Sequence, residues 1–502
     1  MTSLAVADPG RLIQSVDWLA IAPPLIAALA ALAVLVADLF LPDDRKRLLG
    51  WLTVTGLLAA LAMLLPLVLG DTRSTFCFKS PGGGCSYTAD HFALAFQLLV
   101  LGGALLTALL SLHTVDDDRL PRGEYWFLLL SSACGAALLP AARDLATLVI
   151  ALEVASLPAF ALVALRRDGR GAESALKFFL SSVTATAVML LGVSFVYAAA
   201  GTLQLQGVAE GLAHAPAQLK PLAEAGAVLT LVGFAFKTAA VPFHFWVPDT
   251  YVGAPLPVAG YLSVVGKAAG LSGLALVTTL AFRPYGHTWG LVLAVLAALT
   301  MTVGNAAALR QRTGTAFGAV RLLAWSSIGQ AGYLLVPLAA AGYADSAEPL
   351  GATVAYALIY GLVNLGAFGV VALVGGSGRL DDFRGLAARN RWAAYGLAFF
   401  LLCLAGLPPG VVGLFGKVVV FRAAVDAGLG WLAVVMAVNV VIALAYYLKW
   451  TALLFAPAAA ETPEQRRTPA SLSAALGLAA CGAVVLSVAP QLVLQVVSGS
   501  LF

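Results

Sequence analysis

Long apolar runs separated by short polar breaks recur along the whole chain. Each run holds about 20 residues and is rich in Ala, Leu and Val. A helix rises about 1.5 Å per residue, so such a run spans the roughly 30 Å hydrocarbon core of a bilayer. Open sheets would leave backbone groups unpaired in lipid, which favours helices. The pattern therefore predicts an all-α polytopic membrane protein.

Breaks rich in charge, glycine or proline divide the chain into fourteen predicted spans. An even number places both termini on the same side of the membrane. The predicted spans cover residues 17–41, 50–69, 90–113, 123–141, 144–165, 174–200, 222–247, 254–280, 288–308, 315–341, 351–375, 392–425, 429–456 and 470–497.

Positive charge is distributed unevenly between the predicted loops. With both termini outside, the inner loops hold sixteen lysines and arginines and the outer segments hold six. Cytoplasmic loops carry this excess in membrane proteins, so both termini are predicted on the outer side. The first apolar run is too long for a signal peptide and is expected to stay in the mature protein. No basic run points to nucleic acid.

The five cysteines do not form a metal-binding pattern. Cys77 and Cys85 enclose CFKSPGGGC in a loop predicted to lie outside, where a disulfide can persist. Spacing alone does not establish a bond, so the bonded and free forms both stay open. Cys134, Cys403 and Cys481 lie singly in spans, without a Cys-x-x-Cys motif or a histidine partner. We therefore expect no metal in this chain.

Ionisable residues inside the predicted spans are few and are the candidate functional residues. Only 11% of the chain is charged, against roughly 25% in soluble domains. A charged side chain at a helix centre costs about 2.5–3.5 kcal/mol on insertion scales, which favours a polar path over chance. The residues are Glu153, Lys177, Lys237, Lys267, Arg321, Lys417 and Lys449, with His244 nearby.

Three of these residues have a simple structural interpretation. Lys177 and Lys449 lie close to the inner ends of their spans, where a long side chain reaches the interface. Lys177 is kept as a candidate path residue beside that interpretation. Arg321 has a similar position and cannot release its proton, so it is predicted to be an anchor.

Glu153, Lys237, Lys267 and Lys417 lie near the middle of their spans. Reaching water from there is difficult, which leaves two interpretations, a buried ion pair or a hydrated proton relay. A Glu–Lys pair that separates and re-forms could load and release a proton. His244 follows Lys237 by two helical turns and is either a proton carrier or a neutral histidine bonded to freed backbone.

Prolines interrupt the seventh and twelfth predicted spans. Pro242 and Pro248 lie in the first, and Pro408 and Pro409 in the second. Proline removes a backbone donor and clashes with the preceding turn. Irregular backbone at membrane depth is tolerated only where protein or a water-filled cavity covers it, so each break is expected to admit water beside a mid-span lysine.

The two breaks lie five helices apart, which predicts two five-helix repeats. An odd number of helices makes the repeats inverted relative to each other. The predicted organisation is therefore three N-terminal spans over 1–122, a first repeat of spans four to eight over 123–280, a second repeat of spans nine to thirteen over 281–456, and a last span over 457–502.

Several long segments carry a family resemblance in one order along the chain. They read ALEVASLPAFALVALRRD, ESALKFFLSSV, FKTAAVPFHFWVPDTYVGAPLPV, RLLAWSSIGQAGY and LAGLPPGVVGLFGK. Over about residues 90–456 the chain resembles the antiporter-like membrane subunits of proton-pumping NADH:quinone oxidoreductase, respiratory complex I. Within that family it is most similar to the subunit N type, the bacterial counterpart of mitochondrial subunit 2.

The resemblance implies a proton-translocating subunit without redox chemistry of its own. In that family a fifth-span glutamate and lysines of the seventh, eighth and twelfth spans form the proton path. These correspond to Glu153, Lys237, Lys267 and Lys417. Protons are expected to enter from the inside near Lys177, Lys237 and Lys267 and to leave through Lys417. Glu153 would respond to charge changes in a neighbouring subunit.

The resemblance also implies the surroundings of the chain. Its expected partners are other membrane-arm subunits, including another antiporter-like subunit and small membrane subunits, together with lipids. No cofactor is expected in this chain, because FMN, iron–sulfur clusters and quinone belong to other subunits of such a complex. The expected location is the bacterial plasma membrane.

Two other functions fit the same residues. The first is a subunit of a multi-subunit cation/proton antiporter, which shares the motifs and the fold. A sodium requirement would favour it. The second is a scaffold whose buried charges only hold helices together. Neutral replacements of similar volume would then leave turnover and pumping intact.

Overall fold

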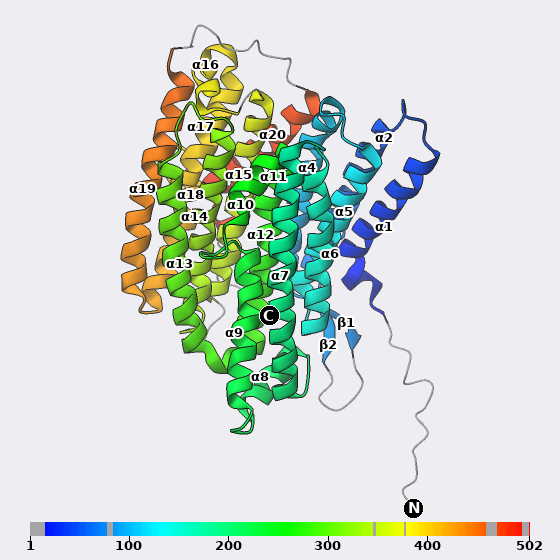
Figure 1. The fold of residues 1–502 in the computed structure, drawn as a ribbon, viewed down its shortest axis with the longest axis vertical. Coiled ribbons are helices and arrows are strands. Elements are labelled where there is room, and N and C mark those ends of the chain that lie inside the picture. Colours follow the sequence, from blue (N-terminus) through cyan, green and yellow to red (C-terminus); the bar gives the residue numbers. More distant parts are fainter. Residues whose placement is uncertain are drawn as a thin grey trace, which may run out of the picture.

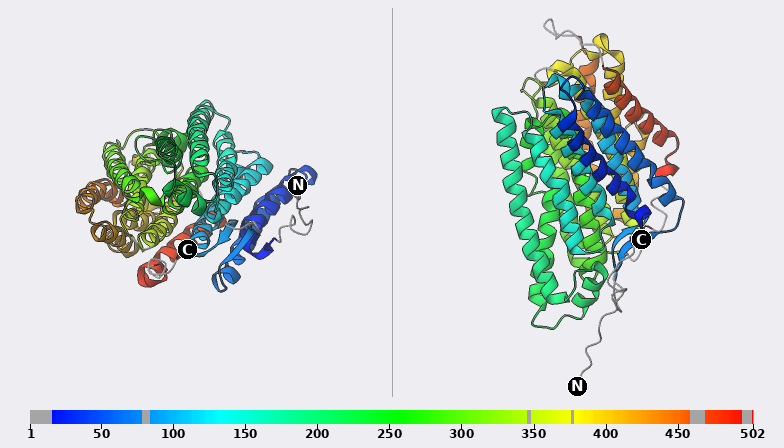
Figure 2. Two further views of the ribbon diagram at one scale, coloured as in Figure 1. Left: turned by 90° about the horizontal axis from the view of Figure 1, so that it is seen from below. Right: turned by 90° about the vertical axis from the view of Figure 1, so that its right-hand side faces the viewer.

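The computed structural model describes residues 16–77, 84–344, 348–375, 378–457, 469–493 and 501. Long helices run side by side along the vertical axis of Figure 1. Seen along that axis the bundle is elongated, with α1 (Trp18–Phe40) at one edge and α19 (Gly430–Phe455) at the other (Figure 2). In the described part of the chain, twelve helices are long and apolar enough to cross a membrane. The prediction of an all-α polytopic membrane protein is confirmed.

Most predicted spans correspond to one continuous helical segment each. Besides α1 and α19 these are α2 and α3 (Arg47–Ala62, Leu64–Val68), α4 (His91–Asp117), α5 with η2 (Arg122–Leu138, Leu139–Ala141), α6 (Leu145–Ala164), α7 (Gly169–Ala200), α11 to η4 (Leu256–Ala281), η5 with α13 (Arg283–Tyr285, Gly286–Leu309), α14 (Gly318–Ala340), α15 (Glu348–Val374) and α20 (Ala470–Val488). Short helices α8 (Leu205–Ala213), η6 (Leu380–Phe383) and α16 (Leu386–Arg389) lie in connections.

Polar caps explain why several helices begin where they do. An aspartate or asparagine side chain accepts a hydrogen bond from a backbone N–H of the first turn, which has no partner within the helix. These caps are Asp17, Asp90, Asp144, Asp168 and Asn390. Each cap lies at the end of an apolar run, where a polar side chain can stay near the interface.

The seventh and twelfth predicted spans are pairs of shorter helices. The seventh consists of α9 (Lys220–Lys237) and α10 (Trp246–Gly253), and the twelfth of α17 (Arg391–Ala405) and α18 (Val411–Asp426). Both first halves end with a residue in the left-handed region, at φ 60° and φ 83° respectively. In each, a backbone N–H bonds to the carbonyl five residues earlier, at 2.9 Å. This termination turns the chain away from the helix axis.

The prolines in these breaks have different positions. Pro242 lies between α9 and α10, and Pro408 and Pro409 lie between α17 and α18, as predicted. Pro248 was predicted to be part of the break, but it is the third residue of α10. A proline is tolerated there because first-turn N–H groups lack helical partners. The seventh span therefore continues beyond its predicted end at residue 247.

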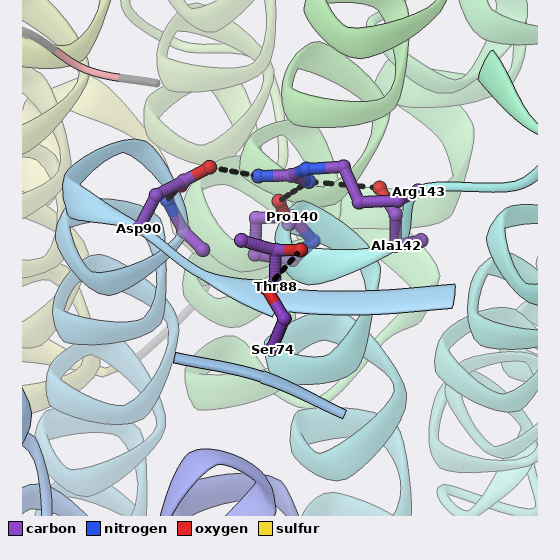
Figure 3. Close-up of polar contacts among 7 residues, drawn as sticks. Ser74, Thr88, Asp90, Pro140, Ala142 and Arg143 are labelled. Atoms are coloured by element: carbon purple, nitrogen blue, oxygen red, sulfur yellow. Dashed lines mark hydrogen bonds and ion pairs between the residues drawn. The ribbon is translucent and has the colours of Figure 1, made fainter. Parts of the chain in front are cut away.

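A β-hairpin at the lower end of the bundle in Figure 1 was not predicted. Strands β1 (Arg73–Cys77) and β2 (Cys85–Ala89) pair antiparallel, with the two cysteines opposite each other and joined by a disulfide. Figure 3 shows how Arg143 anchors the strand end, through the Asp90 carboxylate and the carbonyl oxygens of Pro140 and Ala142. The hairpin is thus tied to the helices beside it.

The predicted sidedness and the repeat division stay predictions. The chain termini, residues 1–15 and 502, lie outside the described residues, as does most of the predicted inner loop after α19. The common geometry of the two interrupted spans is compatible with the division into 123–280 and 281–456. The last predicted span, 470–497, is helical as α20 up to Val488.

Candidate functional site

Three lysines are buried inside the bundle. The exposed fractions of Lys237, Lys267 and Lys417 are 7%, 2% and 5%. They belong to α9, α12 (Lys267–Leu276) and α18. In Figure 1, α12 and its neighbours α10 and α14 lie in the middle of the bundle. A buried ammonium needs polar partners because burial removes its hydration. The nature of these partners therefore decides what each lysine can do.

Lys237 lies between α6 and α7. Its Nζ donates hydrogen bonds to Ser156 Oγ and Ser182 Oγ, each at 2.7 Å. The ring of Phe160 lies 5.5 Å from Nζ. On the other side, α12 approaches so closely that a Cβ on Gly270 would lie 2.8 Å from the Lys237 Cβ. Two hydroxyls and an aromatic ring thus surround the ammonium group.

Glu153 lies near Lys237 but does not pair with it. Glu153 is partly buried on α6, and its Oε1 accepts a hydrogen bond from Thr186 Oγ1 at 2.8 Å. Among the described residues no ion pair joins Glu153 to Lys237. Thr186 and Ser182 are one turn apart on α7, so hydroxyls occupy the path between carboxylate and ammonium. Of the two predicted arrangements, the direct pair is absent from this conformation.

A small cavity lies beside Lys237, at one of the two mid-span lysines where the sequence predicts water. It has a volume of about 30 Å³, and Ser132, Ser156, Lys237 and Tyr261 are among the residues that line it. The Tyr261 hydroxyl donates to Ser132 Oγ at 2.9 Å. A water molecule needs about 10–15 Å³ of such volume and two to four polar partners, which this cavity provides.

Lys267 lies on an irregular helical segment and contacts α14. Its Nζ donates to the Ser327 carbonyl oxygen and, at 2.8 Å, to Ser327 Oγ. Two π-helical turns, η3 (Leu262–Gly266) and η4 (Val277–Ala281), flank α12. The sequence predicted a membrane span over 254–280 without these turns. π-Helical turns are frequent at functional sites, where they redirect a side chain.

Lys417 reaches back across the break in its own span. Its Nζ donates to the Leu404 and Ala405 carbonyl oxygens, at 2.9 Å and 2.7 Å, where α17 ends. The C-terminal carbonyls of a helix carry partial negative charge and favour a cation. Gly406 has φ 83°, and a Cβ there would lie 3.2 Å from the Lys417 Cδ. The break therefore creates the binding site of the lysine.

A layer of polar side chains lies between Lys267 and Lys417. It consists of Ser326, Gln330, Tyr356 and Tyr447, all buried. Its two shortest contacts, both 2.5 Å, join Ser326 Oγ to the Tyr447 hydroxyl and the Tyr356 hydroxyl to Gln330 Oε1. Sequence reasoning missed this layer because uncharged polar residues are common in membrane helices. The only signal was the one-turn spacing of Ser326 and Gln330 in the segment RLLAWSSIGQAGY.

The other predicted residues lie apart from the buried lysines. The Lys177 side chain is 51% exposed and forms ion pairs with Glu173 at 2.7 Å and Asp249 at 3.1 Å. His244 lies in the break between α9 and α10, where its ring packs 5.6 Å from the Trp325 ring. No hydrogen bond between described residues joins it to Lys237. Like Lys177, the anchor candidate Arg321 and the predicted interface lysine Lys449 are on the surface.

A cavity of about 500 Å³ with both polar and apolar walls lies among the loops at one end of the bundle. Its walls include His113, Asp118 and Arg166 together with Val252 of α10 and Leu256 at the start of α11. This end is the predicted inner side. The cavity was not predicted because residues from several separate loops form it.

The fold and the buried lysines beside interrupted helices define an antiporter-like multi-pass membrane protein. The family described as NADH:quinone oxidoreductase/Mrp antiporter, TM matches residues 142–443. The chain belongs to this family.

Relatives extend over nearly the whole chain. NADH-quinone oxidoreductase subunit N 2 of Streptomyces griseus is 65% identical over 517 residues, which cover 99% of this chain and 96% of the relative. NADH-quinone oxidoreductase subunit N of Salinispora tropica is 44% identical over 456 residues, with 88% and 86% covered. These relatives identify the subunit N type that the sequence segments predicted.

Solved structures have the same fold. A chain of respiratory complex I from Thermus thermophilus with bound aureothin has a TM-score of 0.79 and 33% identity, covering 95% of this chain and all of that one. A chain of the Mrp complex from Dietzia has a TM-score of 0.81 but only 21% identity, covering 95% and 96%. The second likeness concerns the fold alone.

Proposed function

We propose that this chain is a proton-translocating membrane subunit of a bacterial NADH:quinone oxidoreductase. The observation that carries the proposal is the chemistry around the three buried lysines. Hydroxyl and carbonyl oxygens hold them, and no carboxylate pairs with them in the described residues. Neutral partners accommodate a lysine with or without its proton, whereas a close carboxylate would hold it charged. A proton relay needs that freedom.

Protons move outward from the inner side in this proposal. Lys177, with Glu173 and Asp249, gathers protons at the surface, and the hydroxyls of Ser182 and Ser156 lead to Lys237. Lys267 receives them next, and Lys417 releases them to the outer side. NADH oxidation and quinone reduction take place in other subunits, which also hold FMN, iron–sulfur clusters and quinone. The host membrane is the bacterial plasma membrane.

The position of Glu153 supports the proposal that a neighbouring membrane subunit covers this face of the bundle. On the same helix, Ile150 is 60% exposed and Leu157 is 52% exposed, so this face turns outward. A carboxylate facing lipid is costly, and a partner that covers it removes the cost. Other membrane-arm subunits, including an antiporter-like one and small ones, are the expected partners. Charge changes there would reach Lys237 through Glu153 and Thr186.

The ion that is moved distinguishes this proposal from the cation/proton antiporter, which the family description also names. We expect sealed vesicles with the purified complex to acidify their interior on NADH addition at the same rate with sodium or choline as the only added cation. A pH-sensitive dye inside the vesicles measures the rate. A rate that depends on sodium and persists without quinone would support the antiporter instead.

A further inference from the structure

Gln330 stands at the junction between the surroundings of Lys267 and Lys417. It lies on α14, one turn from Ser326 and close to Ser327, which holds Lys267. Its exposed fraction is 2%, so all its polar atoms need partners inside the protein. The amide therefore has a defined orientation, and that orientation controls the hydrogen bonding between the surroundings of the two lysines.

Three hydrogen bonds fix the amide. Nε2 donates to the Leu404 carbonyl oxygen at 3.4 Å and to the Tyr447 hydroxyl at 3.2 Å, and Oε1 accepts from the Tyr356 hydroxyl at 2.5 Å. A carbonyl oxygen only accepts, so the nitrogen must face Leu404. The Tyr447 hydroxyl accepts from Gln330 and is then free to donate to Ser326 Oγ.

The Leu404 carbonyl has a second donor, the Lys417 ammonium group at 2.9 Å. Charged donors form the stronger hydrogen bonds, and the distances agree, since Gln330 is 0.5 Å farther away (3.4 against 2.9 Å). Loss of a proton from Lys417 weakens its hold on this oxygen. Gln330 can then move closer to Leu404 and away from Tyr447. The shared carbonyl thus links the charge of Lys417 to the position of the amide.

An amide transmits hydrogen bonding but does not relay protons. Hydroxyl, carboxyl, imidazole and ammonium groups release and accept protons, whereas the side-chain amide has no group that titrates in water. Between Leu404 and Tyr447 the hydrogen-bonded connection of the described residues runs through Gln330. A proton held by the Ser326–Tyr447 pair therefore cannot pass toward Lys417 while the amide is in place.

We propose that Gln330 is a gating residue that separates the Lys267 and Lys417 sections of the proton path and opens when Lys417 releases the Leu404 carbonyl. The inference rests on the proposed function and specifies how that path is regulated. Gln330 is a positioning residue, since it carries no proton itself. Without such a barrier, protons would flow back through the subunit down the membrane potential.

Another buried glutamine provides a matched control. Gln97 on α4 has an exposed fraction of 0%, and its Nε2 donates to the Tyr87 hydroxyl at 2.9 Å and to the Ala137 carbonyl oxygen at 3.0 Å. The pattern of tyrosine and carbonyl is the same as at Gln330. No described lysine shares the Ala137 carbonyl. Converting each glutamine to glutamate therefore makes the same chemical change at a junction and away from it.

The test measures passive proton flow in the assembled complex. The complex is reconstituted in sealed vesicles of phosphatidylethanolamine and phosphatidylglycerol, and a potassium gradient with valinomycin sets the potential without NADH. We expect Gln330→Glu to raise the proton conductance about tenfold, because a carboxyl relays protons where the amide does not. Gln97→Glu is expected to stay at the wild-type value. Adding Lys417→Met to Gln330→Glu should restore that value.

Three results would overturn the gate: a wild-type conductance in assembled Gln330→Glu, an equal rise in Gln97→Glu, or a leak that survives Lys417→Met. If Gln330→Glu does not assemble, Gln330→His places another proton-relaying group there and is expected to leak in the same way. NADH-driven pumping separates the two proposals. If Lys417→Met loses pumping but Gln330→Glu does not leak, only the proposal of a gate is refuted. If Lys417→Met pumps normally, the proposed function is refuted.

Discussion

The complex with Lys417→Met is expected to assemble and to lose NADH-driven proton pumping by about a hundredfold, the lower end of the range for loss of a proton-transferring group. Methionine preserves most of the side-chain volume but cannot hold a proton. The Leu404 and Ala405 carbonyls lose their ammonium partner, so protons cannot leave through the end of α17. Proton uptake by sealed vesicles and quinone reduction, measured on the same preparation, give the result.

Two controls separate proton transfer from charge and from folding. Lys417→Arg keeps a cation beside the same carbonyls but cannot release its proton, so it is expected to pump as poorly as Lys417→Met. Lys449→Met removes a lysine exposed on α19 and should behave as wild type. Full pumping in Lys417→Arg together with loss in Lys417→Met would show that the charge is structural.

Lys237→Met is expected to lower proton pumping and quinone reduction together, by about two- to tenfold. The two activities are coupled, so a blocked relay slows electron transfer as well. Ser156 and Ser182 would lose the donor that both hydroxyls now accept from. NADH-driven proton uptake and quinone reduction are measured in vesicles with equal amounts of assembled complex.

The double variant of Ser156→Ala and Ser182→Ala is the control for this position. It leaves Lys237 in place and removes its hydroxyl partners, so a relay that uses them is slowed while the lysine still titrates. If Lys237→Met leaves both activities unchanged, this lysine is structural. The path would then have to run through Lys267 and Lys417 alone.

The membrane spans and the buried lysines could be predicted because both follow from the cost of polar groups in lipid. Apolar runs must be helical, and a lysine such as Lys267 in an Ala- and Leu-rich helix requires a reason. The breaks were predictable on the same grounds from Pro242, Pro408 and Pro409. These are local properties, in which each residue is judged against its own segment.

The partners of the lysines could not be predicted, because they depend on helix packing. Nothing in the sequence indicates that Ser327 faces Lys267, or that Lys417 reaches back to Leu404. Gln330 has the same uncharged side chain as many surface residues. Only its position between three other helices gives it a role. The π-helical turns around Lys267 were likewise not predicted, because the prolines and glycines near them are also compatible with a regular α-helix in a membrane.

Charge alone did not decide whether Glu153 and Lys237 contact each other directly. Opposite charges in neighbouring spans favour a direct pair, but hydroxyls on α6 and α7 lie close enough to bind each group separately. Hydrogen bonds to neutral groups satisfy both charges without fixing them to each other. The separation also keeps Glu153 free to respond to a charge on a neighbouring subunit.

Lys267 joins the two halves of the path, so the proton-to-electron ratio of Lys267→Met tests the central claim most directly. NADH oxidation is followed together with proton uptake into sealed vesicles that hold the assembled complex. If protons cross the membrane through this chain, the variant either takes up fewer protons per electron than the wild type or, where coupling holds, slows NADH oxidation and proton uptake together. An unchanged ratio, with assembly and NADH oxidation at wild-type levels, would contradict the claim that its buried lysines carry protons.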